Sequence, residues 1–207
     1  MISAAATQER DNRLRQMWGV LRAYVEAHAE PFHSFTGALP YDLSLLATDT
    51  KTLPTGAMLA EMSTFARPET RPLVEAVIAV ADLLEWQQGY DEVQVGSDYL
   101  ARSGWCHLAG PDGPILMTGA RLFLGYWGGG LDYPFHWHAA EELYLTLAGS
   151  AIFRAEGRAD VRVGPGDSVH HASWQPHATQ FGSKGFLALI AWRGADLSMK
   201  LEMETRK

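Results

Sequence analysis

Apolar positions near the N-terminus repeat with the period of an α-helix. From Leu14 onward they recur every three or four residues, the spacing of a helix that buries one face. The run comprises Leu14, Met17, Trp18, Leu21, Tyr24, Val25 and His28. We therefore expect one helix over residues 8–29.

A second helical pattern follows a stretch rich in glycine and proline. Residues 31–56 break the periodicity and are expected to be mostly loop with a short helical turn. Pro72 suits the first turn of a helix, and apolar residues then recur with helical spacing to about Gln87. The N-terminal third is therefore expected to be helical.

Beyond Gly89 the pattern changes to short apolar and aromatic segments separated by turn signals. These signals are PDGP at 111–114, GGG at 128–130, AGS at 148–150 and GPGD at 164–167. Such punctuation predicts short antiparallel strands that close into a barrel or sandwich. We expect a mainly β fold, with a helical N-terminal extension over residues 1–88 that packs on a β-barrel of residues 89–207.

Composition narrows the possible partners. The chain has 207 residues, enough for one domain or one domain with an extension. Its formal charge is −7, from 24 acidic and 17 basic residues, and the basic residues are not clustered. This charge pattern argues against a nucleic-acid or anionic-lipid partner. A small-molecule ligand is the expected partner, for a monomer or a homodimer.

The apolar runs and the single cysteine bear on location. We see neither a signal-peptide pattern nor a run of roughly 18 apolar residues, the length that a membrane helix needs. Cys106 has no partner for an internal disulfide, and its setting between Trp105 and His107 predicts a small buried core residue. We expect a cytoplasmic protein.

The stretch GLDYPFHWHAAEELYLTLAG, residues 130–149, holds the candidate chemistry. His136, His138, Glu142 and Tyr144 all have even numbers, so along extended backbone their side chains share one face. The segment Ala139–Glu141 suits a turn between two strands. We expect a hairpin that presents two imidazoles, a carboxylate and a phenol on one side.

Two imidazoles and a carboxylate predict a bound divalent transition metal, with Zn, Fe, Mn, Co and Ni all compatible. A further histidine must come from His170, His171 or His177, and we favour His177. His170 and His171 have opposite parity, so at most one of them points inward. His136 is open to two interpretations, a metal ligand or a donor to the substrate.

The same residues resemble a known family. Gly130, His136, His138, Glu142 and Gly149 match the first cupin motif, G-x5-H-x-H-x3-E-x6-G, and residues 164–167 with His177 resemble the second. The second motif departs from the strict pattern, because His177 lies further from the glycine turn and no Asn follows. The resemblance implies a cupin barrel, also called a double-stranded β-helix or jelly roll.

A closer resemblance covers residues 86–197, including SWQPHA and AWRG, and points to the cupin-type dimethylsulfoniopropionate (DMSP) lyases. These enzymes cleave a zwitterionic sulfonium compound to dimethyl sulfide and acrylate. The resemblance implies that a metal is held by His138, Glu142 and His177. It also implies that the pocket is lined by His136, Tyr133, Tyr144 and Trp192.

This chemistry needs a base and a site for a cation. β-Elimination removes a proton next to a carboxylate, and a metal bound to that carboxylate stabilises the negative charge that develops. A phenol near the metal becomes a general base, with Tyr144 our first choice and Tyr133 our second. Aromatic faces attract the sulfonium. The available aromatic residues are Tyr126, Trp127, Tyr133, Trp174 and Trp192.

Two other functions also fit the ligand pattern. Two histidines and a carboxylate describe the site of non-haem Fe(II) oxygenases, so a cupin dioxygenase acting on a small organic acid is one alternative. A non-catalytic cupin that binds a small molecule is the other. Oxygen dependence separates the first alternative from a lyase, because elimination proceeds without oxygen.

Overall fold

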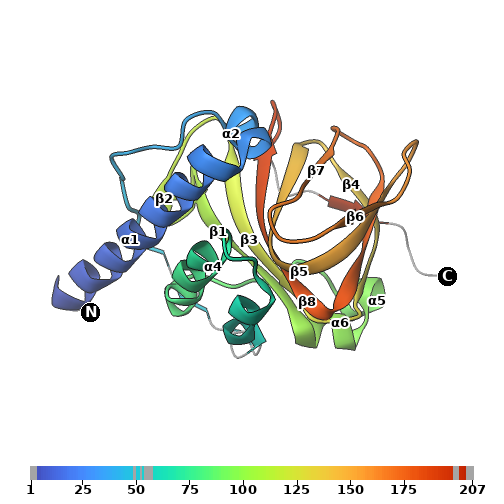
Figure 1. Cartoon of the computed structure of the whole chain (residues 1–207), viewed down its shortest axis with the longest axis horizontal. Coiled ribbons are helices and arrows are strands. Elements are labelled where there is room, and N and C mark those ends of the chain that lie inside the picture. The colour runs from blue at the N-terminus through green and yellow to red at the C-terminus, as the bar shows by residue number, and fades with distance from the viewer. Residues whose placement is uncertain (1–3, 49, 52, 54–57, 198–200, 204–207) are drawn as a thin grey trace.

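The structure is a computed structural model, and it describes residues 4–48, 50–51, 53, 58–197 and 201–203. Strands form one curled sheet, and the N-terminal helices lie against its outer face (Figure 1). The mainly β fold with a helical N-terminal extension is confirmed. None of the described helices is long and apolar enough to cross a membrane.

The N-terminal helices largely follow the predicted pattern. They are α1 (Ala4–His28), α2 (Glu30–Thr36), the 3₁₀ helix η1 (Ala60–Phe65), α4 (Arg71–Ile78) and the 3₁₀ turn η2 (Ala81–Leu83). The helix expected at 8–29 is confirmed as α1, and α2 is the helical turn in the loop region. The helix expected at 72–87 ends earlier, because Val80 leaves helical geometry and Leu84 is extended. The side chains of Val80 and Leu84 are still buried, so the apolar spacing correctly indicated burial but not a continuous helix.

Two short helices precede the first strand and were not predicted. They are α5 (Glu92–Val95) and α6 (Ser97–Arg102), so strand β1 begins only at Ser103. Asp91 caps α5 by accepting a hydrogen bond from the Gln94 backbone N–H at 2.9 Å, and the Gln94 side chain accepts from the Asp91 N–H at 3.0 Å. This reciprocal pair is a recognisable start signal for a helix.

The strands make one sheet in which β8 is the central connector. They are β1 (Ser103–Gly110), β2 (Ile115–Leu116), β3 (Arg121–Trp127), β4 (Asp132–His138), β5 (Glu141–Ala155), β6 (Val161–Val163), β7 (Ser168–His171), β8 (His177–Arg193) and β9 (Leu201–Met203). Strand β8 pairs antiparallel with β5 on one side and with β4 and then β3 on the other, so it lies at the centre of the sheet. Strands β6 and β7 extend the sheet from β5, and β9 pairs with β4.

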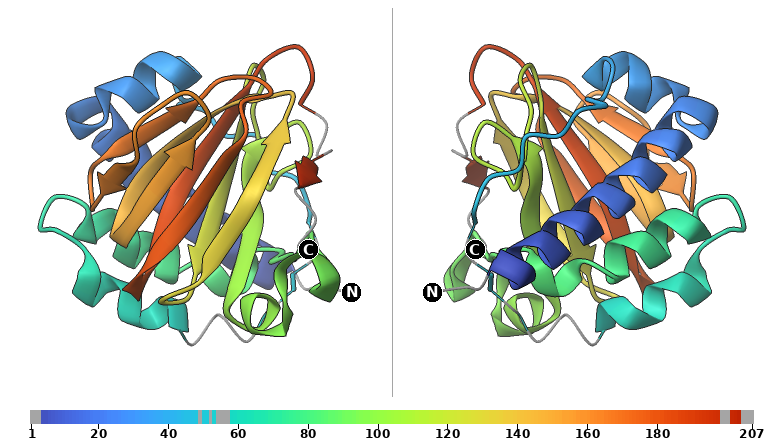
Figure 2. Two further views of the ribbon diagram at one scale, coloured as in Figure 1. Left: turned by 90° about the vertical axis from the view of Figure 1, so that its right-hand side faces the viewer. Right: turned by 90° about the vertical axis from the view of Figure 1, so that its left-hand side faces the viewer.

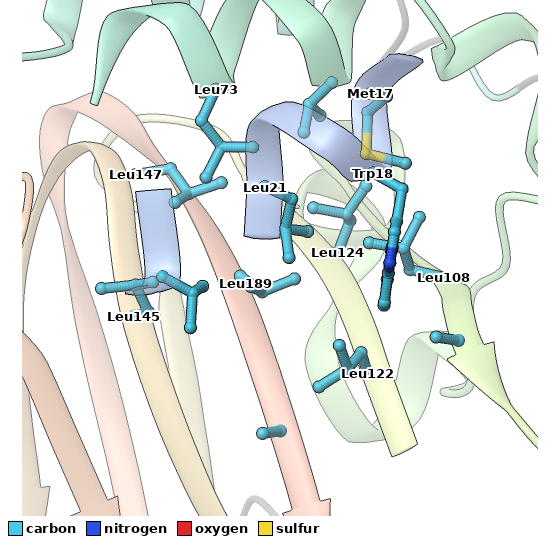
Figure 3. Close-up of a cluster of buried hydrophobic side chains, with 14 of the residues drawn as sticks. Met17, Trp18, Leu21, Leu73, Leu108, Leu122, Leu124, Leu145, Leu147 and Leu189 are labelled. Atoms are coloured by element: carbon cyan, nitrogen blue, oxygen red, sulfur yellow. The ribbon is translucent and has the colours of Figure 1, made fainter. Parts of the chain in front are cut away.

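Helix α1 covers the outer face of the sheet (Figure 2, right). Its buried side chains meet leucines from β1, β3, β5 and β8, as Figure 3 shows. The labelled residues are Met17, Trp18, Leu21, Leu73, Leu108, Leu122, Leu124, Leu145, Leu147 and Leu189. Each fully buried leucine contributes about 2 kcal/mol of hydrophobic free energy. The division of the chain at residue 88 stays a prediction, and residues on both sides of it share this core.

Gly149, the last residue of the first motif, lies where β5 and β8 approach closely. Its φ is +79°, and a Cβ there would come within 2.0 Å of the Gly185 carbonyl oxygen. The position therefore needs glycine, both for its backbone conformation and for space. Cys106 is fully buried, as predicted, and burial raises the pKa of its thiol.

Candidate metal centre

The predicted hairpin carries its even-numbered residues on one side. Strand β4 ends at His138 and β5 begins at Glu141, so the two alanines between them make the turn. His136, His138, Glu142 and Tyr144 all line one cavity of about 280 Å³. Alternation along the two strands, together with the turn, brings these four side chains together.

His177 joins this group from another part of the chain. It is the first residue of β8 and lies opposite His136 of β4 in the antiparallel pairing of the two strands. The ligand atoms of His138, Glu142 and His177 all lie within 4.8 Å of one another, and the three side chains are buried. Two separate segments, the β4–β5 hairpin and the start of β8, therefore converge on one point.

Hydrogen bonds fix the orientation of each potential ligand. Nδ1 of His138 donates to the Ala140 carbonyl at 3.0 Å, and Nδ1 of His177 donates to the Gln175 carbonyl at 2.8 Å. Because a carbonyl only accepts, the proton sits on Nδ1 and each Nε2 keeps its lone pair. Trp192 Nε1 donates to Oε1 of Glu142 at 2.8 Å, so Oε2 is the free carboxylate oxygen. Such outer contacts orient metal ligands.

The atoms left free face one another. Nε2 of His138 and Nε2 of His177 lie 3.5 and 3.1 Å from Oε2 of Glu142, yet these buried atoms form no hydrogen bond with the described residues. Lone pairs gathered in a buried site are costly without a proton or cation between them. The three residues therefore fit a divalent metal.

Electrostatics of the triad agree with this assignment. Burial alone would raise the pKa of Glu142, but His138 and His177 hold it well below its usual range. Burial opposes charge on His138, whereas Glu142 raises its pKa above the usual value. The carboxylate is therefore ionised and attracts positive charge.

His136 lies beside the triad rather than within it. Its Nδ1 donates to the Pro134 carbonyl at 2.8 Å, and its ring stacks on Tyr133 with centroids 3.9 Å apart. The ring centroid of His177 is 4.1 Å away. Burial, and then His177, hold the pKa of His136 well below its usual value, so this imidazole is neutral. Of its two predicted roles, a contact with the substrate suits this position better.

The neighbouring histidines separate by parity, as expected. His171 is buried and stacks on His177 with centroids 4.0 Å apart and planes 10° apart. His170 points outward and lies 3.2 Å from Oε2 of Glu141, which also accepts from Arg193 at 2.8 Å. His177, rather than either of these, meets His138 and Glu142.

Two residues predicted to bind substrate do not line this cavity, and the prediction is corrected for them. Tyr126 is buried in the core beneath the N-terminal helices, because the neighbouring Trp127 takes the inward position on β3. Trp174 is 53% exposed in the loop after β7 and has a φ of +59°. Tyr133 and Trp192 do line the cavity.

Sequence reasoning missed part of the cavity wall. Tyr90 and Tyr99 reach it from the segment around α5 and α6, outside the barrel strands. Trp105, His107 and Phe123 line it from β1 and β3. Parity along β3 could have identified Phe123 with Trp127, whereas only the tertiary fold brings Tyr90 and Tyr99 to this place.

The tyrosine hydroxyls in the cavity are neutral in the protein without bound metal. Burial, and then the Glu142 carboxylate, raise the pKa of Tyr144 well above its usual value. Burial is also the main reason that the pKa of Tyr133 is raised. A tyrosine here becomes basic only beside a cation.

Comparison with known proteins identifies the family. A family model for dimethylsulfoniopropionate lyases matches residues 38–188. The chain belongs to this family. The predicted membership is thus confirmed, and the match begins well before residue 86, where the sequence resemblance was first placed.

Individual members of the DMSP lyase family are similar over nearly the whole chain. Dimethylsulfoniopropionate lyase DddQ of Ruegeria pomeroyi is 34% identical over 176 residues, which are 84% of this chain and 88% of that protein. Its crystal structure covers 93% of this chain and 96% of its own, at 31% identity and a TM-score of 0.83. A crystal structure from the work on DMSP lyases RdDddP and RnDddQII covers 95% and 100%, at 35% identity and a TM-score of 0.88. The cupin fold is confirmed.

Proposed function

We propose that this member of the DMSP lyase family cleaves dimethylsulfoniopropionate to dimethyl sulfide and acrylate in the cavity beside the triad. His138, Glu142 and His177 would hold a divalent metal, and Tyr144 would act as the base. The observation that carries the proposal is that three buried ligand atoms, from His138, Glu142 and His177, have no hydrogen-bond partner among the described residues and lie within 4.8 Å of one another. The cavity that His138 and Glu142 line also contains the buried Tyr144. Family membership supplies the reaction type.

The chemistry divides between the triad and the tyrosine. When bound there, a divalent cation supplies Lewis acidity that stabilises charge on the substrate carboxylate and lowers the pKa of a nearby phenol. Tyr144, as the phenolate after its own proton has passed to solvent, would take the proton from the carbon next to the carboxylate. The electron pair forms the carbon–carbon double bond of acrylate, and the C–S bond pair leaves with sulfur as dimethyl sulfide. The proton on Tyr144 returns to solvent.

Two observations favour Tyr144 over Tyr133 as the base. Tyr144 lies two residues after Glu142 on the same face of β5, so it lines the cavity next to a proposed metal ligand. The hydroxyl of Tyr133 is already in hydrogen-bond contact with that of Tyr90. Tyr133 and His136 remain available to bind the substrate, and their stacked rings form one side of the cavity.

The sulfonium end of the substrate fits the aromatic wall. Trp192 lies with its ring 4.3 Å from that of His138 and 5.3 Å from that of Phe123, between the triad and the apolar part of the cavity. Aromatic faces attract a cation by about 0.5–2 kcal/mol each. The substrate carboxylate would lie beside the triad, so the aromatic wall is the part of the cavity suited to the sulfonium at the other end of the substrate.

Metal identity, cellular location and assembly extend the proposal. Two imidazoles and a carboxylate accept Zn, Fe, Mn, Co or Ni, and comparing rates after loading each metal would identify the one that supports turnover. A cytoplasmic location and a monomeric or homodimeric state stay predictions.

The deciding experiment is an anaerobic assay. Purified protein loaded with one defined metal is incubated with DMSP, and dimethyl sulfide and acrylate are measured in equal amounts over time. We expect release of both products at the same rate with and without oxygen. Turnover that requires oxygen would favour a dioxygenase, and tight binding without products would favour a binding cupin.

A further inference from the structure

Tyr90 reaches the cavity from a segment that is fixed to the barrel from outside. Gln87 pairs with Trp105 of β1 through two backbone hydrogen bonds, of 2.7 and 3.1 Å. The Gln88 side-chain amide donates to the backbone carbonyls of Leu100 and Ser103. These contacts hold the backbone on the N-terminal side of Tyr90 against β1 and α6. The Tyr90 ring therefore extends into the cavity from a segment whose position is fixed.

The Tyr90 hydroxyl contacts the hydroxyl of Tyr133 inside the cavity. The two rings lie 5.5 Å apart at 61°, and both residues line the cavity wall. Tyr99 is also close, with its ring 5.7 Å from that of Tyr133, but its hydroxyl accepts a hydrogen bond from Trp127 Nε1 at 2.7 Å. Tyr90 is therefore the residue that engages the Tyr133 hydroxyl in the described part of the chain.

The ring of Tyr133 is held in place, so only the direction of its O–H bond can change. The ring stacks on His136 at 3.9 Å, and the following Pro134 restricts the backbone. A neutral phenol has one proton to donate and an oxygen that accepts. If Tyr90 donates to the Tyr133 oxygen, the Tyr133 proton is left to point into the cavity.

We propose that Tyr90 is a positioning residue: its hydroxyl donates to Tyr133 and turns the Tyr133 O–H toward the substrate carboxylate. This inference rests on the proposed function, because that function supplies the carboxylate. Tyr133 then acts in substrate binding while Tyr144 acts on the proton. Tyr90 itself acts only through Tyr133.

The test is Tyr90→Phe, which keeps the ring and removes the hydroxyl. We expect the KM for DMSP to rise roughly fivefold, the effect of one neutral hydrogen bond, with kcat within about twofold of wild type. Metal content and thermal midpoint should not change. In a Tyr133→Phe background the same substitution should have no further effect, because the two hydroxyls act as one unit.

Tyr41→Phe is the matched control, since Tyr41 is exposed and its hydroxyl contacts only Glu26 in the described chain, at 3.3 Å. An unchanged KM in Tyr90→Phe, or an equal effect with and without the Tyr133 hydroxyl, would overturn the positioning role. Titration calorimetry with acrylate tests the same role without turnover. Acrylate affinity should weaken roughly fivefold in Tyr90→Phe, and unchanged affinity would contradict it even if the wild type released no dimethyl sulfide.

Discussion

The two faces of the barrel sheet are built from the same strands but follow different rules. Along β5, Leu143, Leu145 and Leu147 pack beneath the N-terminal helices, whereas Glu142 and Tyr144 face the cavity. The face of the sheet beneath the N-terminal helices, the helix side, is covered by apolar side chains, most of them leucines (Figure 3). The cavity side buries a carboxylate and several imidazoles, which no apolar core would accept unpaired.

Because alternate residues of a strand face opposite sides, neighbouring residues contribute either to stability or to the chemistry of the site. On the helix side, free energy scales with the apolar area that is removed from water, so side-chain volume matters most. On the cavity side, free energy depends on whether each polar atom has a partner. Substitutions at neighbouring residues of β5 and β8 should therefore have different effects, with loss of stability on the helix side and loss of metal binding or turnover on the cavity side.

The largest expected effect is the loss of a metal ligand. His138→Ala should abolish metal binding and lower kcat/KM at least about 10³-fold, since Lewis-acid stabilisation is worth several kcal/mol. Metal content by elemental analysis and product release are measured on the same sample. His170→Ala is the control, because His170 points outward and should keep both. A His138→Ala protein that retained stoichiometric metal would contradict the triad.

Tyr144→Phe should separate chemistry from metal binding. Removing a general base lowers kcat by about 10²–10⁴-fold, while the triad atoms stay in place. The measurement is kcat under saturating DMSP, beside metal content and circular dichroism. Near wild-type turnover would transfer the role of base to another group, with Tyr133 next.

Leu145→Ala tests the other face of the same strand. Leu145 is fully buried, and its truncation should cost about 2–5 kcal/mol of unfolding free energy. Denaturant unfolding measures this cost, and Leu116→Ala, at a 40% exposed position, is the reference. Metal content of the folded fraction should stay at wild-type level. Loss of metal from folded Leu145→Ala would mean that the two faces are not independent.

Trp192→Phe should have a smaller effect on the cavity side. It keeps an aromatic ring but removes the donor to Oε1 of Glu142, and loss of such an outer contact lowers metal affinity or activity about 10–100-fold. Competition with a chelator measures the affinity. The solvent-exposed Trp174 provides the control Trp174→Phe, which should behave as wild type. Equal chelator sensitivity in both variants would remove the orienting role of Trp192.

The smallest effect is expected at the outer rim, at Glu141. Hydrogen bonds from Arg193, and then His170, lower the pKa of this carboxyl group. A lowered folded-state pKa means that the stabilisation is present above the unfolded value, about 4.3, and is lost as pH falls through the folded value. Glu141→Gln should cost less than about 1 kcal/mol at neutral pH, because the pair is partly exposed. The unfolding free energies of the two proteins, measured with denaturant, should converge as the pH is lowered. A difference that grew on acidification would contradict the lowered pKa of Glu141.

Sequence pattern predicted the hairpin part of the site because that part is local. Strand parity and one turn place His136, His138, Glu142 and Tyr144 together, and no knowledge of distant segments is needed. His177 was favoured among three candidate histidines outside the hairpin, and its likeness to the second motif and the family resemblance supported that choice. Its separation along the chain is bridged by the pairing of β8 with β4.

The aromatic wall was harder to predict because proximity in sequence is not proximity in space. Tyr126 lies beside Trp127 in the chain but on the opposite face of β3, and Trp174 lies near His177 but in an exposed loop. Tyr90 and Tyr99 were missed because helices α5 and α6 are short and their packing is a tertiary property. Local propensity says little about such contacts.

Three imidazoles at the site are each held by a carbonyl only two residues away along the chain: Pro134 for His136, Ala140 for His138 and Gln175 for His177. Part of what orients each ring is therefore local to a short peptide, and none of these three carbonyls belongs to the N-terminal helices. Changes at wall residues that contact none of these imidazoles can alter which molecules enter without changing the orientation of the rings. Substitutions at wall residues other than Trp192 can therefore change the substrate while the three carbonyls that hold the imidazoles stay in place.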